Sequence, residues 1–159
     1  MIVVSAAHLQ AIRAEAERAW PEECCGLLVG EADDRGAVQI SAVVPGVNLS
    51  PDRRLGFEVD PQLRFDLTRR LRDSDQRIVG HYHSHPNGPA EPSATDRARA
   101  IEPALVWLIV AVTEGRAGPV AAFHSATDPA TGAPSLSAIE VRERREPSGA
   151  VDRPTARKK

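Results

Sequence analysis

The sequence predicts a single α/β domain in which a mixed central sheet carries helices on its faces. The most apolar run, 105–112, contains no charge. A strand this hydrophobic needs cover on both sides, so it is expected at the centre of the sheet. A second uncharged run, 24–30, ends in glycine and is typical of another buried strand. Helical patterns stand between the strand patterns, and this alternation is typical of helices packed on a sheet.

The chain starts with a short β-branched strand at 2–4, followed by a helix that Ser5 caps and Pro21 ends. Apolar residues recur in this helix at intervals of three and four, which is the period of one buried face. They are Leu9, Ile12, Ala16 and Trp20. We therefore expect this helix to pack on the sheet.

The strand at 24–30 is expected to pair with a strand at 38–44 as a hairpin, because a polar turn with glycine separates them. A loop rich in proline, glycine and polar residues follows at 45–56. Loops of about a dozen residues in compact domains are often functional, so this loop is a candidate wall of a binding groove.

A short strand at 57–59 leads to a second helix, whose start is marked by Asp60 as the cap and Pro61 at the first helical position. Leucines spaced by four form its inward stripe, namely Leu63, Leu67 and Leu71. A strand at 77–84 and a proline-rich loop at 86–92 come next. The latter loop is the second candidate groove wall.

The last part of the chain predicts a helix at 93–101, then the apolar run, then two strands at 119–124 and 136–141. From residue 147 the composition no longer supports structure. The expected division is therefore a domain at 1–142 and a disordered charged tail at 143–159. Seven basic and three acidic residues lie between 142 and 159, and a solvated tail is favoured over contact with nucleic acid.

Composition places the protein among soluble cytoplasmic proteins with no membrane or nucleic-acid partner. No charged and apolar leader opens the chain, and no apolar run approaches the ~20 residues of a membrane helix. The only cysteines, Cys24 and Cys25, are adjacent, which predicts neither a disulfide framework nor a Cys-x-x-Cys redox site. The sequence carries no signature of an oligomeric interface.

A metal centre is predicted where His81, His83 and His85 share one face of a strand and Asp96 opens the next helix. Spacing alone does not say which two histidines bind. Pro86 is expected to break the strand and turn the chain toward Asp96, which favours His83 and His85 and leaves His81 one step deeper. Two imidazoles, one carboxylate and a water form the ligand set of a catalytic zinc.

A structural explanation exists for the same residues. Ser93 and Asp96 have the spacing of a capping box, in which each side chain accepts from the other residue's backbone, so Asp96 could serve the helix alone. Glu22 and Glu23 enter the sheet at 24–30 and are the candidates for a general base. For Glu22 a solvent-facing turn position is preferred.

These residues together resemble the JAMM motif of the MPN+ metallopeptidases. The motif has a glutamate upstream of His-Ser-His-Pro, and six residues later a Ser-x-x-Asp. Glu23, His83-Ser84-His85-Pro86 and Ser93-Ala94-Thr95-Asp96 match every position. Shorter stretches extend the resemblance to the short prokaryotic members over most of the chain. They are Pro21 to Gly30, Asn48, Phe57, Asp60-Pro61 and Ile78-Val79-Gly80.

The resemblance implies a JAMM/MPN sandwich, akin to cytidine deaminases, and a role for each motif residue. His83, His85 and Asp96 would hold Zn²⁺, and Glu23 would be the general acid/base. Ser93 would donate its hydroxyl to the oxyanion. The His-x-Glu and Pro-Cys-x-x-Cys pair of the deaminases is absent, so base deamination is not expected.

Family members hydrolyse the peptide or isopeptide bond after the C-terminal tail of a ubiquitin-like protein, and short prokaryotic members process sulfur-carrier proteins that end in Gly-Gly. The resemblance therefore implies a zinc metallopeptidase with such a protein as substrate. The alternative is a non-catalytic MPN module that serves as a scaffold for protein contacts. Scaffold members typically lack a ligand position, whereas none is missing here.

Overall fold

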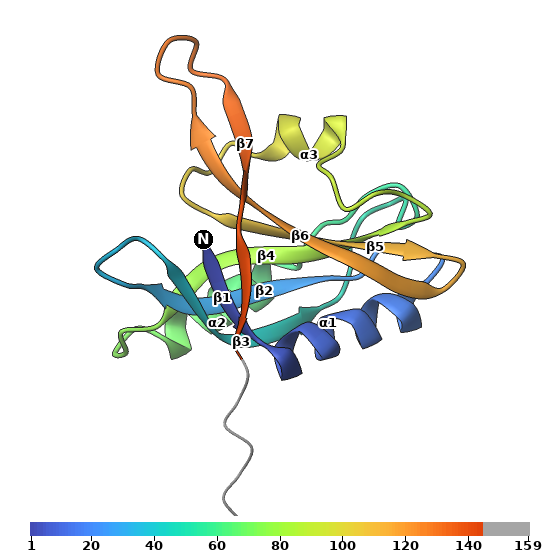
Figure 1. Cartoon of the computed structure of the whole chain (residues 1–159), viewed down its shortest axis with the longest axis horizontal. Coiled ribbons are helices and arrows are strands. Elements are labelled where there is room, and N and C mark those ends of the chain that lie inside the picture. The colour runs from blue at the N-terminus through green and yellow to red at the C-terminus, as the bar shows by residue number, and fades with distance from the viewer. Residues whose placement is uncertain (145–159) are drawn as a thin grey trace, which may run out of the picture.

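The computed structural model describes residues 1–144, so the rest of the expected tail lies outside the described residues. One eight-stranded sheet and three helices make up this part of the chain (Figure 1). In chain order the elements are β1 (Ile2–Ser5), α1 (Ala6–Ala19), β2 (Cys25–Ala32), β3 (Val38–Gly46), α2 (Pro61–Arg70), β4 (Arg77–Pro86), α3 (Ala94–Arg99), β5 (Val106–Thr113), β6 (Arg116–Thr127), β7 (Pro134–Ile139) and β8 (Val141–Arg144).

The sheet is mixed and strongly curled. Its strand order is β7-β6-β5-β4-β2-β3-β1-β8, with β4 parallel to β5 and β1 parallel to both β3 and β8. β7 and β8 therefore lie at opposite edges, although only Glu140 separates them in the chain. One extended segment thus joins the two edges, which requires the sheet to curl toward closure.

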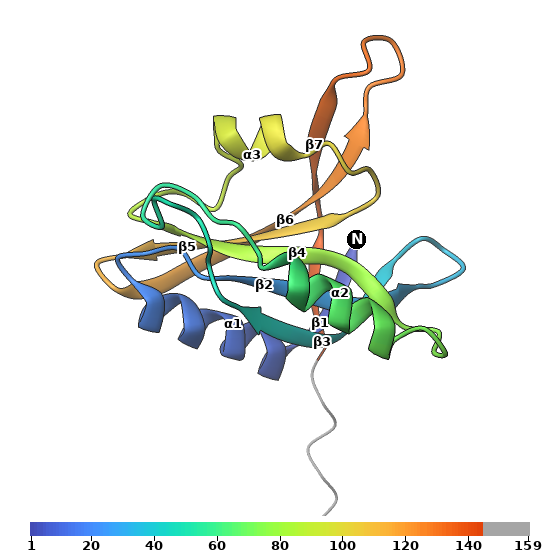
Figure 2. The ribbon, with the colours of Figure 1, turned by 180° about the vertical axis from the view of Figure 1, so that it is seen from behind.

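Two apolar layers cover the two faces of the sheet. α1 packs its buried residues Leu9, Ile12 and Ala16 on one face, against neighbours that include Leu28 and Leu108. α2 and α3 lie on the other face, with α1 and α3 on opposite sides in Figure 1 and α2 in front of the sheet in Figure 2. The predicted α/β architecture with a mixed sheet is confirmed.

Local signals set the elements that frame the site. The Ser5 side chain accepts from the His8 N–H, and the Asp60 side chain accepts from the Gln62 N–H, so both predicted helix starts are confirmed. β2 and β3 form the expected antiparallel pair. β5 is buried over seven consecutive residues between β4 and β6, as a central strand covered on both faces must be.

Trp20 is not on the buried face of α1, contrary to the prediction. The helix ends at Ala19, and Trp20 has the extended ψ of 134°, so its side chain leaves the helical stripe and is 37% exposed. The segment 57–59 is not a strand either. It makes one isolated bridge, between Val59 and Asn48, because the Asn48 side chain rather than a second strand binds the backbone there.

Other boundaries also differ from the prediction. Pro86 does not break β4 but is its last residue, opposite Val112, where its missing N–H is tolerated. α3 ends at Arg99 rather than at 101. The strand expected at 136–141 is two strands, because its halves pair with different edges of the curled sheet. β8 also continues to Arg144, past the expected domain end at 142.

Within residues 1–144, no helix combines the length and apolar character needed to cross a membrane.

Candidate metal centre

Three side chains converge at the end of β4 that faces α3. The Nε2 atoms of His83 and His85 lie 3.0 Å apart. Asp96 Oδ1 lies 3.4 Å from His83 Nε2, and Asp96 Oδ2 lies 3.2 Å from His85 Nε2. Residues two apart on a strand point to the same face, which is why the two imidazoles meet. No other group of three such side chains converges within residues 1–144.

These distances fit a small tetrahedral metal ion. Zinc binds histidine nitrogen at about 2.0–2.1 Å, so two ligand atoms on a tetrahedral zinc lie about 3.3 Å apart. The three separations scatter around this value. Two imidazoles with one carboxylate also form the ligand type of catalytic zinc sites. The residues present therefore fit zinc.

Asp96 serves the helix and the cluster at once. Its Oδ2 accepts from the Ser93 N–H at 2.7 Å, and Ser93 Oγ accepts from the Asp96 N–H at 3.1 Å, which completes a capping box. Burial alone would raise the pKa of Asp96, but hydrogen bonds from His83 and His85 outweigh burial and hold that pKa well below its usual range. The cap and the predicted ligand role, which are alternatives at the level of sequence, are therefore compatible in this structure.

His85 is held by the proline-rich loop. Its Nδ1 lies 3.0 Å from the Pro89 carbonyl oxygen. Since a carbonyl only accepts, Nδ1 is the donor, and in the neutral ring Nε2 keeps the lone pair that a metal needs. Burial lowers the pKa of His85, but hydrogen bonds with Asp96 and Pro89 outweigh it, so the pKa is raised in the metal-free state.

His83 is fully buried and is covered by Phe57, whose ring stacks on the imidazole at a centroid distance of 4.2 Å. Burial lowers the pKa of His83. His81 lies outside the cluster, as expected, but it is half-buried and therefore not deeper than the fully buried His83. Its ring packs 4.2 Å from that of Trp107, and burial lowers its pKa to about 3, so the ring is neutral.

Glu23 lies beside the cluster and is 8% exposed. Its position follows from the pairing of Cys25 with His83, which places the residues before Cys25 alongside His85. Burial raises the pKa of Glu23 to about 7, although the charge of His85 opposes this shift. Glu22 is half-exposed and lies 3.9 Å from Arg53. The two glutamates thus occupy the environments expected from the sequence.

The loop at 45–56 holds the backbone of Glu23. The Glu23 N–H donates to the Arg53 carbonyl at 2.7 Å, and the amide of Asn48 donates to the Glu23 carbonyl at 3.0 Å. Ser84 ties the same segment to the ligand strand, because its Oγ accepts from the Cys24 N–H at 2.9 Å. The segment that carries Glu23 and the strand that carries His83 and His85 are therefore fixed to each other.

The hydroxyl of Ser93 is directed at Asp96. Ser93 Oγ lies 2.7 Å from Asp96 Oδ2 and donates to it. The hydroxyl must therefore turn away from Asp96 before it can serve another acceptor.

The cysteines offer no competing chemistry, since burial raises the pKa of Cys24 and of Cys25 to about 12, and neither is a thiolate at neutral pH.

Sequence reasoning assigned no role to Asn48, Phe57 or Trp107. Asn48 is a buried polar residue inside a polar loop, and an asparagine in such a loop is the available signal for a backbone clamp. Phe57 had been placed in a strand, and Trp107 was one letter in an apolar run. Their contacts with the histidines depend on which segments meet, and that information is not local in the sequence.

Comparison with known proteins agrees with this geometry. Residues 5–126 match the family of prokaryotic homologs of the JAB domain. The chain is 38% identical over 89 residues to the desampylase of Haloferax volcanii, covering 56% of this chain and 62% of that protein. It is 31% identical over 115 residues to the CysO-cysteine peptidase of Mycobacterium tuberculosis, covering 72% of this chain and 75% of that protein.

A solved structure supports the fold over nearly the whole chain. The solution structure of protein DSY2949 from Desulfitobacterium hafniense superposes with a TM-score of 0.75 at 27% identity. The superposition covers 92% of this chain and 94% of that protein. The likeness therefore includes the strands and helices that position the candidate metal centre.

Proposed function

Since the chain belongs to the family of prokaryotic homologs of the JAB domain, we propose that it is a zinc-dependent peptidase of the JAMM type. Its substrate is a ubiquitin-like or sulfur-carrier protein, and the bond cleaved is the peptide or isopeptide bond after the Gly-Gly tail. The observation that carries this proposal is the convergence of two imidazoles and one carboxylate beside a buried glutamate. Two similar proteins, a desampylase and a CysO-cysteine peptidase, support this class of substrate.

His83, His85 and Asp96 are the residues that would hold the zinc. A zinc ion in such a site acts as a Lewis acid, which polarises a carbonyl and lowers the pKa of water. The Pro89 carbonyl accepts from His85 Nδ1, and the Ser93 N–H donates to Asp96 Oδ2. These backbone groups orient two of the three proposed ligands. Phe57 covers His83 and limits the access of bulk water to this ligand.

Glu23 is the proposed general acid/base. Its carboxylate takes a proton from water and later returns it to the nitrogen of the leaving amine. A pKa near 7 suits both steps, because the group can be deprotonated and reprotonated near neutral pH. The clamp on its backbone by Arg53 and Asn48 holds the carboxylate in place.

Ser93 is the proposed donor to the oxyanion that forms on the substrate carbonyl. Its hydroxyl lies at the start of α3, next to Asp96, and so borders the cluster. Because this hydroxyl donates to Asp96 in the structure, the role requires rotation about the Cα–Cβ bond. Ser93 is exposed, and rotation of an exposed hydroxyl is a small rearrangement compared with moving a helix.

The test uses fusions in which a ubiquitin-like or sulfur-carrier protein is joined through its Gly-Gly tail to a peptide, with cleavage followed by mass spectrometry. The zinc-loaded protein is expected to cut after the second glycine. A chelator should abolish cleavage and added zinc should restore it. Glu23→Gln should retain zinc but not cleave. Zinc-loaded wild-type protein that binds such carriers without cutting any fusion would instead support the scaffold alternative.

A further inference from the structure

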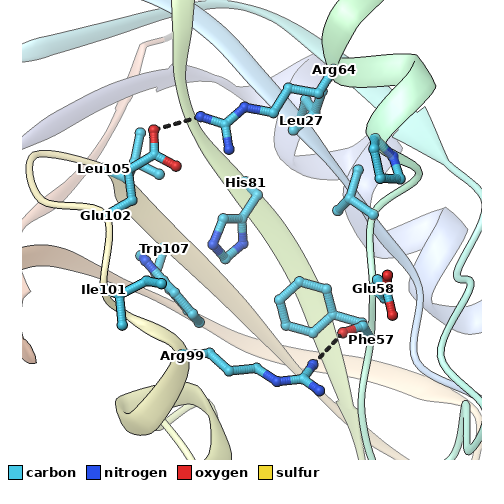
Figure 3. A pocket seen from close by; sticks show the side chains of 12 residues that line it. Leu27, Phe57, Glu58, Arg64, His81, Arg99, Ile101, Glu102, Leu105 and Trp107 are labelled. Atoms are coloured by element: carbon cyan, nitrogen blue, oxygen red, sulfur yellow. Dashed lines mark hydrogen bonds and ion pairs between the residues drawn. The ribbon is translucent and has the colours of Figure 1, made fainter.

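A cavity of about 450 Å³ lies next to the candidate metal centre, on the same face of the sheet (Figure 3). It opens between the segment before α2 and the segment after α3, and its floor is formed by β2, β4 and β5. The lining is mainly apolar and includes Leu27, Phe57, Val59, Leu105 and Trp107. The volume is ordinary for a ligand site, for which about 300–1,000 Å³ is typical.

The cavity wall contains two polar atoms without a partner. Trp107 is 4% exposed, and its Nε1 has no hydrogen-bond partner. The Nδ1 of His81, whose ring packs against Trp107, has none either (Figure 3). An indole nitrogen only donates, and a buried donor without an acceptor costs about 1–3 kcal/mol. Both nitrogens are buried from solvent, so an occupant of the cavity meets other atoms of these two rings.

The charged groups around the cavity are already balanced. Arg64 pairs with Glu102 across the mouth, and Arg99 donates to the Phe57 carbonyl at 2.9 Å (Figure 3). Glu58 is the remaining acidic residue of the lining, so two arginines face two glutamates. The charged residues of the lining therefore carry no net charge, although Arg64–Glu102 is the only ion pair among them within residues 1–144. The lining therefore favours a neutral, apolar group.

The cavity and Glu23 lie in opposite directions from the candidate metal centre. Along β4, Cys25 is opposite His83 and Leu27 is opposite His81, so the cavity lies toward His81. Glu23 precedes Cys25 and thus lies toward His85. If Glu23 returns the proton to the leaving amine, that amine lies on the His85 side. The acyl part of the substrate must then lie on the side of the cavity.

We infer that the cavity binds the side chain immediately before the Gly-Gly tail, and that it selects a large apolar residue there. This inference rests on the proposed function. An extended chain rises about 3.3 Å per residue, so two residues span about 6.6 Å. The rings of His81 and His83 are 6.1 Å apart. With the carbonyl of the second glycine at the candidate metal centre, the residue before Gly-Gly reaches the cavity, where its side chain contacts the lining residues His81 and Trp107.

Binding is tested without catalysis on the full-length, zinc-loaded Glu23→Gln protein. The probes are acetylated peptides Ala-Ala-X-Gly-Gly, where X is Phe, Leu, Ala, Asp or Lys. The indole N–H signals of the two tryptophans are followed by NMR and assigned with Trp20→Phe. The Phe and Leu peptides are expected to shift the Trp107 signal and to bind about tenfold or more tightly than the Ala peptide. The Asp and Lys peptides should bind more weakly than the Ala peptide.

Specificity is tested with carrier fusions that differ at the same residue before Gly-Gly. The ratio of kcat/KM for Phe over Ala should be about tenfold or more, and Val59→Phe should reduce it by narrowing the cavity. Ile101→Asp, at a rim position that is 75% exposed, should lower the ratio even if Val59→Phe fails to fold. Phe65→Ala, on the exposed side of α2, is the control and should leave the ratio unchanged.

The two arms separate this inference from the proposed function. Cleavage of all fusions with no preference before Gly-Gly, together with an unmoved Trp107 signal, would overturn the cavity's role and leave the peptidase intact. A selective Trp107 shift without cleavage of any fusion would support the cavity and contradict the peptidase. Absence of both cleavage and shift would overturn both.

Discussion

Asp96 makes two sets of contacts, and substitutions can separate them. Asp96→Asn retains an oxygen that can accept from the Ser93 N–H, whereas Asp96→Ala does not. We expect both variants to bind zinc more weakly, because both lose the anionic ligand. Only Asp96→Ala should also lose about 0.5–2 kcal/mol of metal-free stability through the broken cap.

Zinc titration and urea unfolding of chelator-treated protein measure the two effects. Equal zinc affinity in Asp96→Asn and wild type would mean that Asp96 is only a capping residue. Asp75→Asn and Asp75→Ala make the same two changes at an exposed position and are the matched controls, which should alter neither quantity.

Burial of Glu23 predicts a pH-dependent cost in the metal-free protein. Its pKa is about 7 in the folded state against 4.5 for the unperturbed group, so folding favours the protonated form. The cost is absent below about pH 4.5, grows as the pH rises through 7, and is then complete. Glu23→Gln removes it, so the variant should be about 1–3 kcal/mol more stable than wild type at pH 8 and similar at pH 4.5.

Urea unfolding of the chelator-treated proteins at several pH values checks this dependence. Glu22→Gln is the matched control, because Glu22 is the neighbouring residue and is half-exposed. It should show no such growth with pH. A stability gain of Glu23→Gln that is the same at pH 4.5 and at pH 8 would contradict the assigned environment.

At the scale of elements, Ser84 joins β4 to the segment that enters β2. Its hydroxyl is the acceptor for the buried Cys24 N–H. Ser84→Ala leaves this donor without a partner and should cost about 1–3 kcal/mol of stability. Because Glu23 directly precedes Cys24, the rate of the proposed hydrolysis in Ser84→Ala should fall more steeply than its affinity for zinc. Thermal unfolding, zinc content and kcat check this, and wild-type activity in Ser84→Ala would exclude a positioning role.

Most elements were predictable because their signals are local. Ser5 and the Asp60-Pro61 pair mark helix starts, and the uncharged run of β5 marks a central strand. The elements that were misjudged depend on distant partners. The segment at 57–59 is not a strand because Asn48 satisfies its backbone, and Pro86 stays in β4 because β5 pairs with its end.

The candidate ligands were predictable for a related reason. Strand period places His81, His83 and His85 on one face, and Asp96 follows from its place at the first turn of a helix. The choice of His83 and His85 came from the JAMM resemblance and from a strand break at Pro86, and the structure does not show that break. The surroundings of these side chains were not predictable, because Phe57 and Trp107 reach the histidines from separate segments. The cavity forms between those segments, so neither its volume nor its apolar lining is written in any one stretch of sequence.

At the scale of the whole molecule, β8 adds an edge strand to the curled sheet beside β1. Val141 lies opposite the buried Ile2 and packs on the core beside α1. Val141→Asp should destabilise the protein by about 1–3 kcal/mol, because it places a carboxylate against apolar neighbours. Arg142→Asp, at the next and more exposed position, should cost less than about 0.5 kcal/mol.

Differential scanning calorimetry of both variants checks the contribution of this edge strand. The sheet joins the strands that carry the ligands to the edge strands, so Val141→Asp should lower Tm in one transition rather than create a second one. Equal Tm in both variants would mean that the contact between β8 and β1 contributes little to the fold.

The metal content of the purified full-length protein tests the central claim most directly. Elemental analysis after zinc loading and dialysis should give about one zinc per chain in wild type and in His81→Ala. The double variant His83→Ala with His85→Ala should retain none, with folding of each protein checked by circular dichroism. Zinc retained by the folded double variant, or lost from folded His81→Ala, would contradict the assignment of His83, His85 and Asp96 as the metal ligands.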